Sequence, residues 1–199
     1  MKRILTVIAI TATLLARAEP DLEQRVAQLE KEVAELKAAL APVIEEARAE
    51  HIADGQRNAA RARMRKDAEI YSRDELKEIE SLYQVANKQW KSAEGKESLK
   101  KLISKYDRAN RTGCALLYLG QMSRGEERER YLQQAIRDFS DCYYGDGVQV
   151  GAYARYCLAY HFKESGEPEK AAALFNAIGE HYPDAINHQG KPLSTLIEQ

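Results

Sequence analysis

One pattern of large and small residues, between Ala154 and Asp184, constrains the fold of this chain most strongly. Leu158 and Phe162 lie one turn apart on a first expected helix, and Ala171 and Phe175 lie one turn apart on a second. A glycine and a proline between the two helices suit a turn and the start of the second helix. A helix pair of this kind leaves one apolar face uncovered, so it needs neighbours.

The same pattern recurs twice toward the N-terminus. Moving back 39 residues places Leu119 at the position of Leu158, and a further 37 residues reaches Leu82. Ser72 and Glu75 form a capping box ahead of the first copy. We predict a repeat domain over 72–199, with helix pairs near 76–109, 113–146 and 152–185 and a capping helix over 190–199. A generic antiparallel bundle is the alternative, and it shares the helices but not a groove.

The N-terminal residues have the pattern of a secretory signal peptide. Two basic residues precede an uncharged apolar run from Ile4 to Leu15, and Ala16 and Ala18 occupy the positions that a signal peptidase reads. An apolar helix of this length spans only ~18 Å, against a hydrocarbon core of ~30 Å, so we expect no stable membrane insertion. We predict a signal peptide over 1–18, cleavage between Ala18 and Glu19, and a periplasmic or secreted mature chain.

Residues 19–43 carry apolar side chains at alternating steps of four and three. This heptad pattern places leucine at d and mainly valine at a, which favours a two-stranded coiled coil and leaves a trimer open. In a parallel pair, Arg25 would face Glu30 of the partner helix, and Glu32 would face Lys37. We predict a homo-oligomer, although an amphipathic helix docked on its own domain is the alternative. The predicted interface residues are Leu22, Val26, Leu29, Val33, Leu36 and Leu40.

Residues 44–71 form the predicted connector between these two parts. Pro42 is expected to end or kink the preceding helix. The segment beyond it is rich in alanine, arginine and glutamate and has few apolar anchors. Arg57, Arg61 and Arg65 lie four residues apart, which would suit an anionic partner, but we favour a solvated polar helix with charges on every side.

The sequence shows few signs of catalysis, metal binding or nucleic-acid binding. A formal net charge of −1 gives no reason to expect binding to nucleic acid. The four histidines show no spacing typical of metal ligands, and the sequence contains no nucleophile elbow, P-loop or dinucleotide fingerprint. Gly145-Asp146-Gly147 matches a fragment of a calcium loop, but a turn between repeats explains it better. We therefore expect no enzyme, no catalytic residue, no metal and no cofactor.

The three cysteines, Cys114, Cys142 and Cys157, are an odd number for an oxidising compartment. A bridge between Cys142 and Cys157 is compatible with their places on adjacent expected helices. Small buried thiols that fill helix contacts explain them equally well.

The third copy resembles a tetratricopeptide repeat, on Leu158, Ala171, Phe175 and the ending Tyr182-Pro183. The order of signal peptide, short coiled coil, connector and repeats resembles the periplasmic coiled-coil/tetratricopeptide proteins that accompany the Tol-Pal system in cell division. The resemblance implies an all-α fold: a coiled-coil helix followed by an α-solenoid of about three helix pairs. It also implies a non-catalytic adaptor or scaffold for a protein partner in the cell envelope, in envelope maintenance or cell division.

Stacked helix pairs curve, and the first helix of each pair would line the concave side. Tyr153, Tyr156 and Tyr160 form a strip on one such helix, and tyrosine is common among interface anchors. With Arg124 and Lys163 nearby, this groove would suit a peptide that carries a carboxylate. The alternatives are that some tyrosines pack between repeats, and that the chain is a structural spacer or assembly component with no specific groove ligand. The predicted groove residues are Gln84, Asn87, Leu117, Gln121, Arg124, Tyr153, Tyr156, Tyr160 and Lys163.

Overall fold

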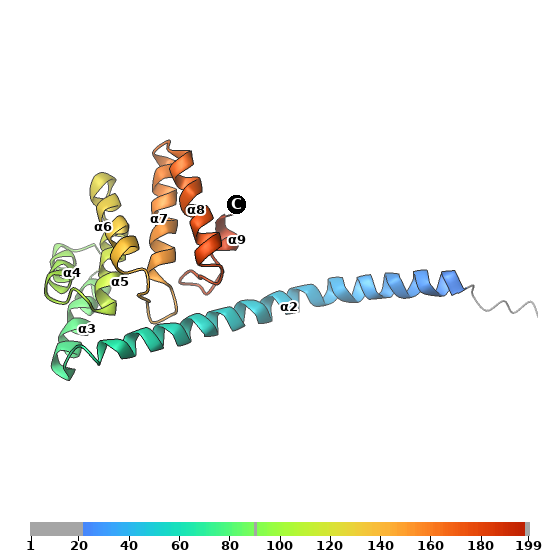
Figure 1. Ribbon diagram of the computed structural model, residues 1–199, viewed down its shortest axis with the longest axis horizontal. Helices are drawn as coiled ribbons and strands as arrows, with labels where there is room; N and C mark the ends of the chain where they lie inside the picture. Colours follow the sequence, from blue (N-terminus) through green and yellow to red (C-terminus); the bar gives the residue numbers. More distant parts are fainter. Residues whose placement is uncertain (1–21, 90, 198–199) are drawn as a thin grey trace, which may run out of the picture. The chain divides into compact units, whose positions relative to one another are not determined.

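The computed structural model describes residues 22–89 and 91–197, over which every regular element is an α-helix (Figure 1). The prediction of an all-helical fold is therefore confirmed, while the predicted signal peptide lies outside the described residues. The chain divides into two compact units, residues 1–47 and 48–199. The helices are α2 (Leu22–Asp67), α3 (Arg73–Lys88), α4 (Ala93–Lys105), α5 (Asn110–Met122), α6 (Gly125–Asp138), α7 (Val150–Glu164), α8 (Pro168–His181) and α9 (Ser194–Ile197).

In the first unit, the described residues 22–47 all belong to α2. Pro42 lies inside this helix, so of the two outcomes that we expected, an end or a kink, the end does not occur. Proline removes one backbone hydrogen bond, but the flanking residues are mostly alanine, glutamate and other good helix formers that extend the helix past it. The apolar residues at heptad spacing are 46–76% exposed in the single chain, so they form an uncovered stripe. They are Leu22, Val26, Leu29, Val33, Leu36, Leu40 and Val43.

In the second unit, α2 residues 48–67 pack against the domain. Ala53, Ala60 and Asp67 are buried at intervals of seven residues, which places them on one face of the helix. Gly147, at φ +97°, lies so close that a Cβ there would meet the backbone nitrogen of Arg57 at 2.9 Å. This segment is therefore not the solvated connector that we expected, because small residues on both sides let it approach the domain.

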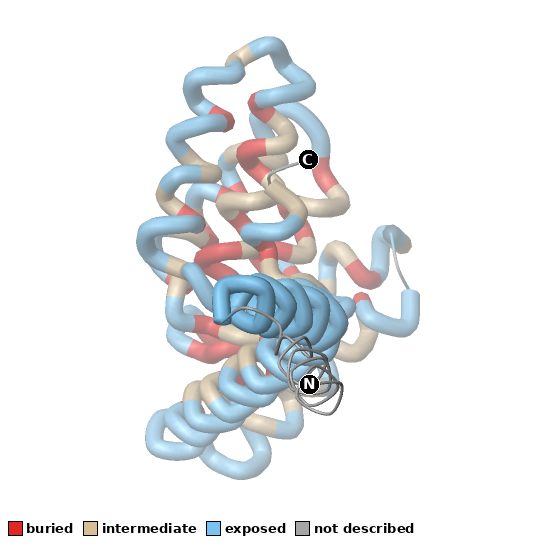
Figure 2. Tube along the Cα trace, turned by 90° about the vertical axis from the view of Figure 1, so that its right-hand side faces the viewer, coloured by how far each residue is buried: buried red, intermediate tan, exposed pale blue. Residues whose placement is uncertain are grey.

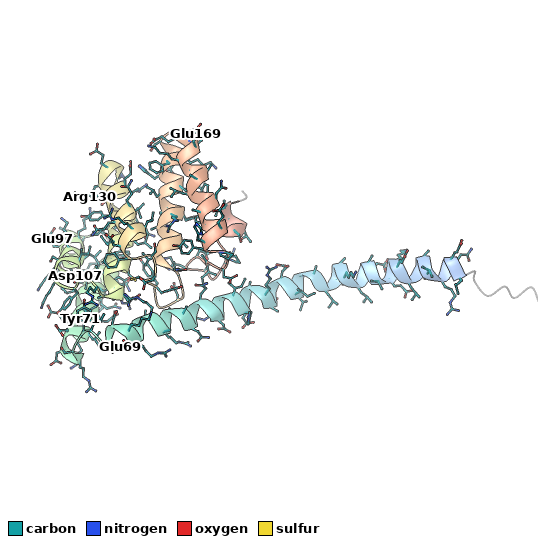
Figure 3. The ribbon with its side chains drawn as sticks, viewed as in Figure 1. Glu69, Tyr71, Glu97, Asp107, Arg130 and Glu169 are labelled. Carbon is teal, nitrogen blue, oxygen red and sulfur yellow. The ribbon has the colours of Figure 1, made fainter. Side chains whose placement is uncertain are left out.

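Asp67 and Tyr71 hold the end of α2 in place. Arg63 Nη1 donates to Asp67 Oδ1 at 2.7 Å, and Arg63 Nε donates to Asp141 Oδ2 at 3.1 Å. Tyr71 follows α2 and lies beside the turn that contains Asp107 (Figure 3), where its hydroxyl accepts from the backbone nitrogen of Arg108 at 3.3 Å. The charged end of α2 is thus a structural contact with the segments that precede α5 and follow α6.

Helices α3 to α8 pack in sequence, each against the helix that follows it. In addition, α5 contacts both α3 and α7, so the first helices of the three pairs are neighbours. Most of the buried residues lie along these helices, whereas α2 is exposed over residues 22–47 (Figure 2). Leu99, Leu116 and Leu132 are among the fully buried side chains of this core.

The spacing of the pairs depends on which end of the helices is compared. The first residues of α3, α5 and α7 are Arg73, Asn110 and Val150, which gives steps of 37 and 40 residues, close to the predicted 37 and 39. Their last residues give steps of 34 and 42, because the three helices differ in length. Leu82 is only half-buried where Leu119 and Leu158 are buried.

Two similar turns follow α6 and α8. After α6, Tyr144 N donates to Val148 O at 2.9 Å; after α8, Asn187 N donates to Lys191 O at 2.9 Å. Each turn closes with an isolated antiparallel bridge and contains a glycine with positive φ, Gly147 or Gly190. The shorter connection between α4 and α5, residues 106–109, leaves no room for such a turn.

The capping box at the start of α3 is confirmed. Ser72 Oγ accepts from Glu75 N at 3.4 Å, and Glu75 Oε2 accepts from Ser72 N at 2.8 Å. The hydrogen bonds from Ser72 hold the pKa of the Glu75 carboxyl below its ordinary value.

The three cysteines are free thiols, which favours the second interpretation of their role. Cys114 and Cys142 are buried in helix contacts, and Cys157 is half-buried on α7. Burial raises the pKa of the Cys114 thiol to about 12. They fill space between helices as small apolar side chains do.

Candidate functional site

Two cavities lie along the first helices of the pairs, α3, α5 and α7. The first has a volume of about 360 Å³ and the second about 280 Å³. The first is lined by Tyr83, Gln84, Asn87, Arg111, Tyr118, Gln121, Tyr144, Gly145, Asp146 and His188. The second is lined by Gly120, Gln121, Arg128, Tyr156, Cys157, Tyr160 and Glu164. Gln121 lines both, so the two cavities adjoin at that side chain.

Several predicted groove residues line these cavities. Gln84, Asn87 and Gln121 contribute to the first. Tyr156 and Tyr160 contribute to the second. These five come from three different helices, and the fold brings them to neighbouring walls.

Other predicted groove residues lie elsewhere. Leu117 is fully buried and belongs to the core, which corrects its assignment to the groove. The reason is that α5 is covered by helices on several sides, so most of its side chains are enclosed. Arg124 and Lys163 are exposed and line neither cavity, although Lys163 Nζ lies 5.8 Å from the centre of the Tyr160 ring.

The predicted tyrosine strip both borders the second cavity and packs against its own chain. Tyr153 stacks on Tyr156 with ring centres 5.7 Å apart, and Tyr156 meets Tyr160 at 4.8 Å. Tyr160 also contacts the Phe175 ring at 5.4 Å, and its hydroxyl donates to Leu196 O at 3.2 Å. The alternative of packed tyrosines is therefore correct in part, and alanine at these positions would affect stability as well as binding.

Arg111 lines the first cavity and is paired with Glu80, which lies behind it and does not line the cavity. Arg111 Nε and Nη2 donate to the two carboxylate oxygens of Glu80 at 2.8 and 3.2 Å. The Arg111 guanidinium also lies 4.4 Å from the centre of the Tyr83 ring. Burial by itself would raise the pKa of Glu80, but hydrogen bonds from Gln84 and Arg111 hold it below its ordinary value. The pair is therefore ionised, oriented and close to neutral as a unit.

Four aromatic rings form a continuous wall of the same cavity. Ring centres are 6.3 Å apart for Tyr118 and Tyr83, 6.4 Å for Tyr83 and Tyr144, and 5.0 Å for Tyr144 and His188. Two hydroxyls are anchored on backbone: Tyr144 donates to Cys114 O at 3.0 Å, and Tyr118 donates to Ala86 O at 3.2 Å. The rings are thus held in place before any ligand arrives.

The tips of the two bridged turns meet at this cavity. His188 Nδ1 lies 2.8 Å from Asp146 Oδ2, and Val148 N donates to Asp146 Oδ1 at 3.3 Å. Burial would raise the pKa of Asp146, but the hydrogen bond and charge of His188 outweigh it and leave the pKa below its ordinary value. Asp146 is therefore a carboxylate at neutral pH.

Sequence reasoning missed most of this first cavity. It interpreted the glycine-flanked Asp146 only as a turn and assigned no role to His188, Arg111, Tyr118 or Tyr144. Their contacts join segments that are far apart in the chain, and the one local signal was the similarity of the two turns that follow α6 and α8.

The second cavity contains a thiol that is not activated. Burial raises the pKa of Cys157 to about 11, so the thiol is protonated at neutral pH. An activated cysteine needs the opposite shift. Cys157 therefore lacks the property that a nucleophilic thiol needs.

No protein-family model, curated protein or solved structure matches this chain. Among the helices that the structure describes, none is both long enough and apolar enough to cross a membrane.

Proposed function

We propose that this chain is a non-catalytic adaptor that binds a protein or peptide partner along α3, α5 and α7. The observation that carries the proposal is the position of Gln121, which borders both cavities. A ligand that reaches from one cavity to the other must pass this side chain. The site therefore fits an elongated ligand better than a compact one.

The chemistry of the shared walls fits a peptide. Gln84, Asn87 and Gln121 carry carboxamides, which donate and accept hydrogen bonds just as a peptide group does. They can bind an extended backbone, which rises about 3.3 Å per residue, whatever its side chains are. Each cavity would then receive one or two side chains of the partner.

The repeat domain is, in this proposal, a tetratricopeptide-like α-solenoid. Sequential packing of three helix pairs supports it, as does the contact of α5 with both α3 and α7. The two similar turns, whose glycines Gly147 and Gly190 lie 43 residues apart, support a repeated unit as well. In such a stack the first helices line the concave face.

Self-association is the second part of the proposal. The uncovered heptad stripe of α2 would pair in parallel with the stripe of another copy, as a dimer or a trimer. The a and d positions that follow Val43 are Ala47, Glu50, Asp54 and Arg57, so the apolar seam ends near residue 43. Joined chains would bind a repetitive partner more tightly, because the second binding event becomes intramolecular.

We propose that this adaptor acts in the cell envelope after its signal peptide is cleaved. Its role there would be in envelope maintenance or cell division. The sequence pattern of residues 1–18 and the order of coiled coil and repeats support this location.

A random peptide library displayed on phage, selected on the purified protein, tests the binding function. The affinity of a selected peptide is then measured by calorimetry for Gln121→Ala and for Gln133→Ala. Gln133 is an exposed glutamine on α6 that lines neither cavity of the site, so it is the matched control. We expect Gln121→Ala to weaken binding by about fivefold or more, since it removes a hydrogen-bonding group at the centre of the site. Equal affinities for the two variants would contradict the proposal.

A structural spacer remains the second candidate, and the packing of the tyrosine strip favours it. Tyr160 contacts Phe175 and Leu196 of its own chain, as a residue with a purely structural role would. For a spacer, the selection returns no peptide that depends on Gln121. Deletion of residues 22–43 also separates the two, because an adaptor keeps weak binding to its partner without the coiled coil.

A further inference from the structure

We propose that the first cavity binds a primary ammonium group at the end of an apolar stem, such as a lysine side chain of the partner. This inference rests on the proposed peptide-binding function and names the side chain that the cavity would receive. It differs from the sequence-based expectation, which favoured a carboxylate because of Arg124 and Lys163. Neither of those residues lines this cavity.

The charge balance of the cavity favours a cation. Arg111 is neutralised by Glu80, which holds it through two hydrogen bonds at 2.8 and 3.2 Å. Among the described residues that line the cavity, Asp146 supplies the one carboxylate. Because the Arg111–Glu80 pair is neutral as a unit, the carboxylate of Asp146 is the charge that the wall offers to a ligand. Asp146 would repel an anionic side chain. Arg111 is not available to attract one, because it is already paired with Glu80.

The aromatic walls favour a cation as well. Adjacent rings are inclined by 47° between Tyr83 and Tyr118, 70° between Tyr83 and Tyr144, and 86° between Tyr144 and His188. Rings inclined in this way leave space between them for a ligand, whereas rings stacked face to face would cover each other's faces. The faces of aromatic rings attract cations, and the Arg111 guanidinium over Tyr83 shows this attraction within the same wall.

Hydrogen-bond acceptors are available for the three N–H groups of an ammonium. Asn87 Nδ2 is directed at Gln84 Oε1 (3.5 Å), and Gln121 Nε2 is directed at Cys157 Sγ (3.8 Å). Their amide nitrogens therefore have partners inside the protein, and their carbonyl oxygens can serve a ligand. Asp146 adds carboxylate oxygens, which accept more hydrogen bonds than His188 and Val148 supply.

The size of the cavity agrees with this ligand. A volume of about 360 Å³ is at the lower end of the range for small-molecule sites. It accommodates a four-carbon stem and its ammonium group. Lysine buries such a stem against apolar and aromatic surface while its charged end keeps polar partners.

Four small probes test the proposal on the full purified chain. They are the Nα-acetyl methylamides of lysine, norleucine, Nε-acetyl-lysine and glutamate, each titrated while the side-chain amide NMR signals of Gln84, Asn87 and Gln121 are followed. We expect saturable shifts with the lysine probe. The norleucine and Nε-acetyl-lysine probes lack the charge, so their affinities should be lower by a factor of about five or more. Equal binding of all four probes, or tighter binding of glutamate, would overturn the proposal.

Two sets of variants locate the binding. Asp146→Asn should weaken lysine-probe binding by about three- to tenfold, since it removes the charge that faces the ammonium. Glu164→Gln makes the same chemical change in the second cavity and should leave the affinity unchanged. Tyr118→Phe keeps the ring and should retain binding, whereas Tyr118→Leu should weaken it. If Asp146→Asn and Glu164→Gln weaken binding equally, the ammonium does not sit in the first cavity. Thermal unfolding of each variant shows whether a loss of binding is a loss of fold.

The outcome can be separated from that of the proposed function. Selected peptides that depend on Gln121, contain no lysine and tolerate Asp146→Asn would overturn this inference and leave the adaptor function intact. A lysine probe that binds while no peptide depends on Gln121 would leave the cavity assignment intact and overturn the adaptor function.

Discussion

Asp67 Oδ2 accepts a hydrogen bond from the backbone nitrogen of Asn110 at 2.9 Å, so the last residue of α2 caps the first turn of α5. The residue in the N-cap position of α5 is Ala109, whose side chain cannot accept a hydrogen bond. A carboxylate near a helix N-terminus also interacts favourably with the helix dipole. A helix N-terminus is usually capped by the residue just before it, but here the buried Asp67 of α2 caps α5.

Replacing Asp67 should destabilise the second unit of the chain strongly. Asp67→Ala leaves Arg63, whose side chain is 11% exposed, without its nearest carboxylate and removes the cap of α5. We expect a loss of about 3 kcal/mol in the free energy of unfolding, measured by urea denaturation. Asp54→Ala is the control, because its pair with Arg57 is largely exposed and should contribute about 0–1 kcal/mol. Similar losses for the two variants would show that α2 does not dock through Asp67.

Leu117 should behave as a core residue. It is fully buried in α5, so Leu117→Ala should lower the free energy of unfolding by about 2–5 kcal/mol. Urea denaturation measures this loss, and Leu36→Ala in the exposed stripe should leave the domain's own transition in place. If the Leu117→Ala variant is as stable as the wild type but binds peptide more weakly, Leu117 is a groove residue after all.

The contact between the two turns should depend on pH. The pKa of Asp146 is depressed in the folded state, so its contribution to stability is present above the unfolded pKa of about 3.9 and is lost as pH falls through the folded value. The melting temperature of the wild type should therefore fall more between pH 5 and pH 2 than that of Asp146→Asn. Asp184→Asn, in the exposed part of the other turn, is the control. Parallel pH profiles for wild type and Asp146→Asn would show that His188 does not stabilise the Asp146 carboxylate.

The apolar stripe should hold copies together. Leu29→Glu and Leu36→Glu together place charges in the seam, and we expect the mass from multi-angle light scattering to fall to that of one chain. Ala38→Glu lies at the outer f position and should keep the oligomer. The melting temperature of the second unit should stay unchanged in both variants. An unchanged oligomer in the double variant would contradict the predicted seam.

Much of the fold could be predicted from local patterns. The capping box at Ser72 and the helices on which Leu119 and Leu158 lie follow from residue spacing, because helix periodicity and caps are local properties. The lengths of the connections were not predictable, because the long turn around Gly147 has no counterpart between α4 and α5 that the spacing could reveal. The packing of α2 was missed for a different reason. Ala53 and Ala60 carry too little apolar surface to mark a buried face.

The candidate site was predictable to a smaller extent. Gln84, Asn87 and Gln121 were found because their helices carry a clear apolar register, and the polar positions follow from it. Asp146 and His188 were not, since their contact joins the tips of two turns that are 42 residues apart in the chain. Such tertiary pairs leave no periodic trace in a single sequence.

The most direct test of the adaptor function is an NMR titration of the protein with a peptide selected from the random library. The side-chain amide signals of Gln84, Asn87 and Gln121 should shift together and saturate at one affinity, while those of Gln133 and Gln134 on α6 stay in place. Saturable binding that shifts the α6 signals and leaves the other three unmoved would contradict the proposed groove.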